Sequence, residues 1–165
     1  MMVFGIVGAA ALALSPVSAS VPDVTVEFVD RVRRDAQNSL WHRYDFRFTN
    51  SGSEERILSL CPTEATLYFK NTMAGLTRLE RLAASALAID GESWSFNCRK
   101  RTIAPGDSVM LGIYFRWWEG DFRWWEGDGV RAVRPIMFET SLGKFFVKEG
   151  RIIALGEGDE ETLAI

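Results

Sequence analysis

The sequence predicts a mainly β protein, an antiparallel sandwich or barrel with one short helix near residues 78–88. Segments in which apolar and polar residues alternate are separated by turn-forming residues at intervals of about 8–12 residues. No segment has the strand–helix–strand order that a parallel sheet requires. The chain has 165 residues, of which 47% are hydrophobic, and this is enough for one domain with a single core.

Two strands are expected at the start of this domain, over residues 24–30 and 41–49. Each carries its apolar residues on one face: Val24, Val26 and Phe28 in the first, and Tyr44, Phe46 and Phe48 in the second. The polar residues 31–38 between them are expected to form a loop, and residues 50–53, Asn-Ser-Gly-Ser, a turn. Further short strands are expected over residues 56–60, 65–70, 93–97 and 99–103.

Between these strands the apolar residues change to helical spacing. The residues at this spacing are Leu76, Leu79, Leu82, Ala83 and Ala86. Thr77 and Glu80 match a capping box, in which each side chain can satisfy a backbone N–H at the start of a helix. Asp90 and Gly91 would end the helix, so we expect it near residues 78–88, packed against the sheet.

The second half of the chain predicts further strands. Residues 104–107, Ala-Pro-Gly-Asp, are typical of a type II turn, which favours Pro at its second position and Gly at its third. A long strand over residues 108–118 would have one apolar face, made of Val109, Leu111, Ile113, Phe115 and Trp117. A strand over residues 130–138 and a hairpin over residues 144–155 complete the domain, and residues 157–165 are expected to form an acidic, fraying tail. The total would be eight or nine strands.

The first 19 residues have the layout of a secretory signal peptide. An apolar run over residues 3–14 is followed by small residues at Val17 and Ala19, the positions that a signal peptidase reads. The run is shorter than the roughly 20 residues that span a bilayer, although an uncleaved anchor or a buried core element are alternatives. We therefore expect cleavage after Ala19, a periplasmic or secreted protein, and a single domain over residues 20–156 with no integral membrane span.

Export changes the interpretation of Cys61 and Cys98. In an oxidising compartment two cysteines usually pair. The sequence contains no Cys-x-x-Cys motif and no second histidine that would complete a redox or Cys–His site. We expect a structural disulfide that stabilises the fold by about 3–4 kcal/mol.

Residues 115–121 and 122–128 are identical, and each copy has the sequence Phe-Arg-Trp-Trp-Glu-Gly-Asp. Because side chains alternate with period two, an offset of seven would turn the second copy to the opposite face of a continuing strand, so we expect a turn near residues 119–121. Aromatic and guanidinium groups suit stacking on a sugar or a protein hot spot. The candidate binding surface is therefore Arg116, Trp117, Trp118, Arg123, Trp124 and Trp125. The alternative is a duplication that a surface loop tolerates.

We expect no enzymatic activity and no catalytic, cofactor-binding or metal-binding residues. Acidic residues lie mostly at expected turns, and His42, the single histidine, has no Gly-x-Ser-x-Gly partner motif. One histidine and two paired cysteines do not supply the roughly four ligands that zinc needs. No phosphate-binding glycine motif occurs, and the formal net charge of −3 predicts no nucleic-acid partner.

Two segments resemble bacterial Ig-like and fibronectin-III-like domains. They are residues 46–52, Phe-Arg-Phe-Thr-Asn-Ser-Gly, and residues 103–108, Ile-Ala-Pro-Gly-Asp-Ser. Residues 90–95, Asp-Gly-Glu-Ser-Trp-Ser, are similar to part of the BsuPI-type proteinase-inhibitor domain, itself an Ig-like sandwich. The resemblance covers residues 42–116 and implies an Ig-like fold. The signal peptide, the disulfide and the helix depart from the inhibitor pattern, so no inhibitory residues are transferred.

A fold does not by itself establish a function. The absence of catalytic motifs together with the tryptophan-rich segment favours an exported, non-enzymatic binding domain. Its partner would be a protein or an envelope glycan. The alternatives are a protease-inhibitor-like Ig domain and a small β-sandwich hydrolase.

Overall fold

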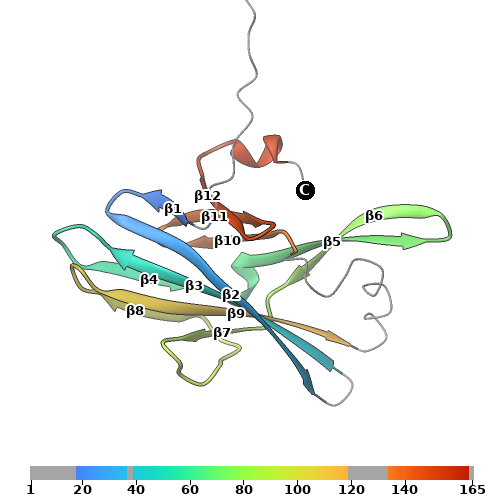
Figure 1. Ribbon diagram of the computed structural model, residues 1–165, viewed down its shortest axis with the longest axis horizontal. Helices are drawn as coiled ribbons and strands as arrows, with labels where there is room; N and C mark the ends of the chain where they lie inside the picture. The colour runs from blue at the N-terminus through green and yellow to red at the C-terminus, as the bar shows by residue number, and fades with distance from the viewer. Residues whose placement is uncertain (1–17, 37–38, 119–133, 164–165) are drawn as a thin grey trace, which may run out of the picture.

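A computed structural model describes residues 18–36, 39–118 and 134–163, and in these ranges the chain forms twelve strands in three sheets (Figure 1). The two five-stranded sheets have the orders β1-β2-β3-β9-β7 and β12-β11-β10-β5-β6, and β4 pairs with β8 in a small third sheet. The strands are β1 (Ser18–Val21), β2 (Val24–Ala36), β3 (Ser39–Asn50), β4 (Arg56–Leu60), β5 (Ala65–Met73), β6 (Leu76–Ala83), β7 (Ala86–Ile89), β8 (Arg99–Ile103), β9 (Ser108–Trp118), β10 (Ile136–Thr140), β11 (Gly143–Lys148) and β12 (Arg151–Leu155).

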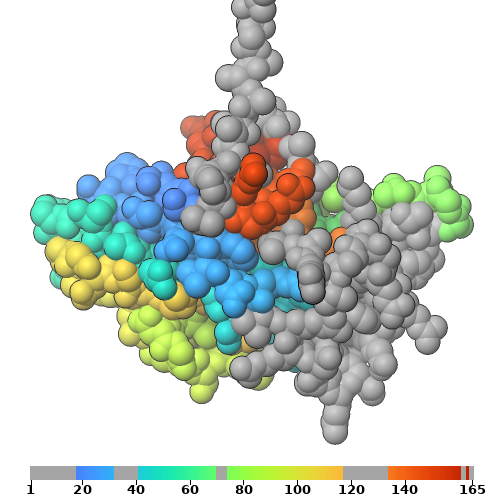
Figure 2. All heavy atoms as spheres, in the orientation of Figure 1, coloured from blue at the N-terminus to red at the C-terminus, as the bar shows by residue number. Residues whose placement is uncertain are grey.

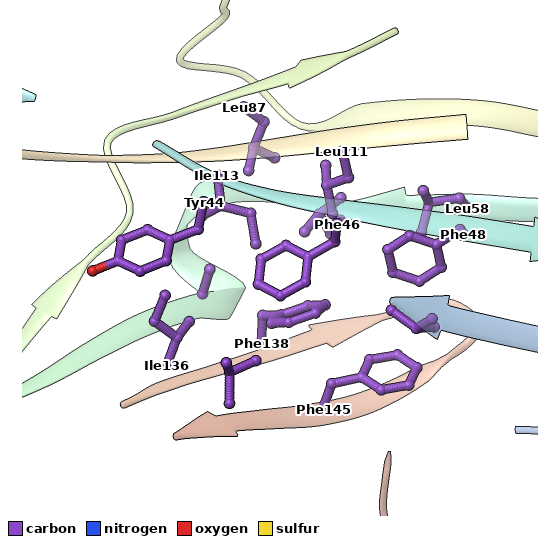
Figure 3. Packing of buried hydrophobic residues seen from close by; sticks show 14 of the residues in the cluster. Tyr44, Phe46, Phe48, Leu58, Leu87, Leu111, Ile113, Ile136, Phe138 and Phe145 are labelled. Carbon is purple, nitrogen blue, oxygen red and sulfur yellow. The ribbon is translucent and has the colours of Figure 1, made fainter. Parts of the chain in front are cut away.

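The two large sheets pack face to face around one core, which confirms the predicted antiparallel β-sandwich. Phe46 of β3 lies 4.6 Å from Phe138 of β10, measured between ring centroids. Phe48 meets Phe145 of β11 edge to face at 5.8 Å. Figure 3 shows these rings pointing toward one another from opposite sheets. All four rings are completely buried, so they hold the layers together through the large apolar area that they remove from water.

The strongest sequence-based predictions are confirmed in β3 and β9. Tyr44, Phe46 and Phe48 of β3 are buried as expected. Strand β9 has the predicted bounds, and its expected apolar face is buried from Val109 to Phe115. The side chain of Trp117 lies outside the described residues.

The turns predicted over residues 50–53 and 104–107 are also present, and Asn50 joins them. Gly106 has a φ of 79°, and the Asp107 N–H donates to the Ala104 carbonyl at 3.0 Å, as a type II turn requires. The Asn50 carbonyl accepts a hydrogen bond from Gly106 N–H at 2.8 Å. Its side-chain oxygen accepts one from Gly52 N–H at 3.0 Å within the predicted 50–53 turn. The completely buried Asn50 therefore links two turns that are far apart in the sequence.

The loop predicted over residues 31–38 is wrong, because β2 continues to Ala36 and pairs with β3 over its whole length. The register of this pair shifts between Phe28 and Asp30, so Val29 is the extra residue of a β-bulge. A bulge interrupts the period-two pattern, and this interruption made the second half of the strand look irregular in the sequence.

The helix predicted near residues 78–88 is also wrong, because these residues form β6, a short crossing and β7. Ala74 and Gly75 both have positive φ, 51° and 78°, which is the two-residue turn that matches the twist of a hairpin. This turn folds β6 back on β5, so that Leu76 pairs with Met73 and the pairing extends to Ala83. The eight paired positions between β5 and β6 outweigh the helical spacing of the leucines, because strand pairing can override local helix propensity.

The remaining segments differ from the expectations in smaller ways. Of the predicted 93–97 strand, only Ser95 pairs, in an isolated bridge with Leu87. The predicted C-terminal hairpin is present as β11 and β12, and Glu149 and Gly150 at its turn both have positive φ. Strand β10 begins at Ile136, and residues 130–133 lie outside the described residues. The described residues include the 3₁₀ turns η1 (Pro62–Glu64) and η3 (Asp159–Thr162), the second within the segment expected to fray.

Most of the predicted signal peptide, residues 1–17, lies outside the described residues. Its last two residues, Ser18 and Ala19, begin β1, where Ala19 pairs with Val26 of β2 and is buried. The expected cleavage point therefore falls inside a strand. Among the described residues, no helix has the length and apolar character needed to cross a membrane.

Candidate functional site

A row of aromatic rings lies on the outer face of the β1-β2-β3-β9-β7 sheet, opposite the core. Because side chains alternate along a strand, the burial of Tyr44 and Phe115 places their neighbours on the outside. Trp41 of β3 pairs there with Arg116 of β9, and Arg43 pairs with Tyr114. The loop after β7 adds two more rings. We call the set Trp41, Arg43, Trp94, Phe96, Tyr114 and Arg116 the aromatic face.

The four rings of the aromatic face form one continuous cluster. The ring centroid of Trp94 lies 5.5 Å from that of Trp41 and 4.8 Å from that of Phe96. Tyr114 meets Trp41 edge to face at 6.3 Å. Trp94 is 47% exposed and Phe96 is 61% exposed. Large apolar side chains that touch one another and remain this accessible are typical of a binding surface.

Two guanidinium groups lie over rings of this cluster. The Arg116 guanidinium carbon is 5.3 Å from the ring centroid of Trp41, and that of Arg43 is 5.9 Å from the centroid of Tyr114. Arg43 also forms an ion pair with Asp45 at 2.9 Å. A hydrogen bond with Tyr114 raises the pKa of Arg43, and Asp45 adds to this rise. Burial raises the pKa of the Asp45 carboxyl, which Arg43 opposes.

The loop over residues 90–98, which presents Trp94 and Phe96, is fixed at several points. Leu87 and Ser95 exchange two backbone hydrogen bonds of 2.9 and 2.8 Å. The Asp90 carboxylate accepts a hydrogen bond from Met110 N–H at 2.7 Å. Further along, the Glu92 carboxylate pairs with two arginines of β8, Arg99 and Arg101. The loop is therefore held in one arrangement before any partner arrives, which lowers the entropic cost of binding.

The predicted disulfide fixes the end of the same loop. Cys61 and Cys98 are bonded across a sequence separation of 37, and there is no free cysteine. Cys98 follows Phe96 by two residues, and Cys61 directly precedes η1. The bond therefore ties the loop of the aromatic face to the segment that leads into the opposite sheet.

A hollow of about 200 Å³ adjoins the aromatic face. Gly112 forms part of its floor: a Cβ there would lie 3.2 Å from Cδ of Arg43 and 3.4 Å from Oδ1 of Asp45. The wall includes Glu92 and Tyr114. Carboxylate, guanidinium and hydroxyl groups in this hollow can form hydrogen bonds with a ligand whose apolar part contacts the rings.

The structure brings only part of the predicted binding surface into this site. Arg116 belongs to the aromatic face. Trp117 and Trp118 continue β9, where they pair with Leu40 and Ser39, but their side chains lie outside the described residues. Arg123, Trp124 and Trp125 lie outside the described residues entirely. The four rings of the face were missed, although two of them, Trp41 and Tyr114, lie on strands whose inner faces were predicted correctly.

A second hollow, of about 430 Å³, lies beside the disulfide and bears on the hydrolase alternative. Glu64 and Glu139 line it, which is the pair of carboxylates that such an enzyme would need. Glu139 is 63% exposed, and the Glu64 carboxylate accepts a hydrogen bond from Cys61 N–H at 2.6 Å. His42 is buried on the inner face of β3, away from solvent. These positions favour a structural role for Glu64 and His42.

Metal binding has no candidate in the part of the chain that the structure describes. No group of three or more His, Cys, Asp or Glu side chains is arranged there to hold a metal ion.

No family model and no curated protein matches the chain. A crystal structure of an uncharacterised β-sandwich protein from Clostridium difficile 630 is similar, with a TM-score of 0.43 and 7% sequence identity, over 86% of this chain and 89% of that one.

Proposed function

We propose that this protein is an exported, non-enzymatic binding domain and that the aromatic face is its binding surface. The observation that carries the proposal is that Trp94 and Phe96 stay 47% and 61% exposed on a fixed loop. Leaving such rings partly in water forgoes part of the free energy that full burial of a large apolar side chain contributes, which is about 1.5–3 kcal/mol. Binding to a partner recovers this free energy.

The composition of the face favours a protein partner over a glycan. Trp, Tyr and Arg are the residues most enriched at the centres of protein interfaces, and the face contains all three. Two of its ring contacts are edge to face and the third, between Trp41 and Trp94, is tilted by 38°, so the rings do not form one flat platform for a sugar ring. The polar hollow around Gly112 would lie at the rim of such an interface.

Export is part of the same proposal. The disulfide supports it, because disulfides form and persist mainly in oxidising compartments. Fractionation of cells that produce the chain tests it directly: we expect the protein outside the cytoplasm, and a cytoplasmic protein with reduced cysteines would contradict export. The narrower Ig-like or inhibitor-like assignment stays a prediction.

The binding proposal is tested by capture from an envelope extract on immobilised protein. We expect the Trp94→Ala/Phe96→Ala variant to lose at least about tenfold of the captured material, since hot-spot truncations cost about 2 kcal/mol or more. Ile57→Ala is the matched control, because Ile57 is 45% exposed but lies on β4. The captured material should disappear when the extract is treated with protease.

Two results would contradict the proposal. Equal capture by wild type and by the double variant would show that the aromatic face is not the binding surface. Capture that survives protease but not glycan-degrading enzymes would mean that the partner is a glycan.

A further inference from the structure

Strand β6 is an open sheet edge of eight residues. It pairs on one side, with β5, and its exposed residues include Leu76 at 63% and Leu79 at 45%. The other end strands of the two large sheets differ: β7 is buried and bridged by Ser95, and β1 and β12 contact each other. Figures 1 and 2 show the β5–β6 hairpin extending beyond the other described strands. An accessible edge of this length is a template for another strand.

We propose that β6 pairs with β6 of a second copy of this chain, so that two five-stranded sheets join into one. The sequence of β6 is Leu-Thr-Arg-Leu-Glu-Arg-Leu-Ala, and it is complementary to itself in antiparallel orientation. With a two-fold axis at Leu79, Arg78 of each copy lies opposite Glu80 of the other. Leu76 then lies opposite Leu82, and Leu79 opposite its own copy.

The backbone of β6 supports this register. Residues of an antiparallel strand alternate between those that bond to the partner strand and those whose N–H and C=O point away from it. Met73 and Leu76 close a two-residue turn and are therefore a hydrogen-bonded pair. Thr77, Leu79 and Arg81 then direct their backbone groups to the open edge. In the proposed register Leu79 bonds to Leu79, and Thr77 to Arg81, of the second copy.

Charge distinguishes this register from its neighbours. A two-fold axis moved to Arg78 would place two arginines opposite each other, and an axis at Glu80 would place two glutamates opposite each other. Like charges directly opposite are destabilising, whereas opposite charges contribute roughly 0.2–1 kcal/mol per pair. The proposed register contains two Arg78–Glu80 pairs in positions where side chains approach closely, because non-hydrogen-bonded pairs bring Cα atoms to about 4.5 Å.

The test is sedimentation velocity of the purified protein from about 10 µM to about 1 mM, the range in which small interfaces assemble. We expect a monomer–dimer equilibrium in the wild type. Arg78→Glu and Glu80→Arg each place like charges opposite one another twice, so each should weaken the dimer about tenfold or more. The double variant restores opposite charges and should restore the dimer.

Two controls keep the interpretation specific. Trp94→Ala changes the aromatic face alone and should dimerise like the wild type, so failure of the binding proposal leaves this one intact. Circular dichroism of each variant shows that the sandwich is formed, which is expected because Arg78 is exposed and Glu80 is only partly buried. A wild type that stays monomeric at the highest concentration, equal dimerisation of the single variants, or no rescue in the double variant would overturn the proposal.

Discussion

The loop of the aromatic face and the β5–β6 hairpin both present large apolar side chains to solvent, but they are held in opposite ways. The loop is tied by a disulfide, by the Glu92 ion pairs and by the bridge between Leu87 and Ser95. The hairpin extends from its sheet, and most residues of β6 are exposed along its whole length. One region is fixed by contacts to other elements, and the other mainly by its own two strands.

This difference suggests two kinds of recognition. A fixed loop presents side chains in a set geometry, so it suits a partner that recognises the shape and chemistry of those side chains. An open strand presents backbone donors and acceptors, so it suits another strand, and its side chains set only the register. The two regions can therefore be separated by changes that disturb one and spare the other.

Removal of the disulfide should have the largest effect. We expect the Cys61→Ala/Cys98→Ala variant to lose about 3–4 kcal/mol of unfolding free energy in urea denaturation, because the unfolded chain is no longer cross-linked. Hydrogen exchange should become faster at residues 91–97 and unchanged in β6. Equal acceleration in both regions would show that the disulfide does not fix the loop selectively.

The next largest effect is expected from a substitution in the core that supports both regions. Burial raises the pKa of Tyr44 to about 12. An unfolded tyrosine loses its proton near pH 10, so the folded protein is destabilised as pH rises from about 10 to about 12, by about 3 kcal/mol. Tyr44→Phe should remove this part of the pH dependence. Urea denaturation at several pH values measures it, and identical alkaline slopes in the two proteins would contradict the assignment.

Gly75 and Gly91 form a matched pair, one in each region. Both have positive φ, 78° and 73°, and a Cβ at either position would contact nothing within 4 Å. Replacement by Ala should therefore cost about 1 kcal/mol at each site through the backbone alone. We expect Gly75→Ala to weaken dimerisation and Gly91→Ala to weaken capture of the partner. If each variant impaired both properties, the two regions would not be independent.

Loss of the Glu92 ion pairs should have the smallest effect. The Glu92 side chain is 49% exposed, and exposed ion pairs contribute at most about 1 kcal/mol. Glu92→Gln should lower the unfolding free energy by less than that, and the difference should shrink at high salt. Glu157→Gln, at an exposed carboxylate outside this network, is the control. A loss that is independent of salt would point to packing and not to charge.

The sequence predicted those parts of the fold in which local pattern and tertiary packing agree. The alternation around Phe46 and the Pro-Gly turn before β9 identified two central strands and their buried faces. The disulfide between Cys61 and Cys98 was predicted only from the expected oxidising compartment and from the presence of two cysteines. The bulge at Val29 and the turn at Gly75 were missed, because each interrupts the alternation of apolar and polar residues by which a strand is recognised. The spacing of Leu76, Leu79 and Leu82 matches a helix, and only the pairing with β5 makes this segment a strand.

The candidate site was predicted at one residue, Arg116. Trp41 and Tyr114 are neighbours only because β3 pairs with β9, which no local pattern specifies. A partial signal was present, since the outer positions of the strands predicted over residues 41–49 and 108–118 already contained Trp41, Arg43 and Tyr114. Trp94 lies in a loop whose position depends on Leu87, on Glu92 and on the disulfide, and such a position follows from tertiary contacts alone.

The position of Ala19 has a consequence for the order of events during maturation. Ala19 is buried in β1 and paired with Val26, so the peptide bond that follows it is inaccessible to a protease once β1 has docked. If the chain is cut after Ala19, the cut has to precede docking, and only Ser20 and Val21 of β1 remain to cover the edge of β2. Processing and folding would then compete for the same four residues, and their relative rates would determine which N-terminus the finished sandwich carries.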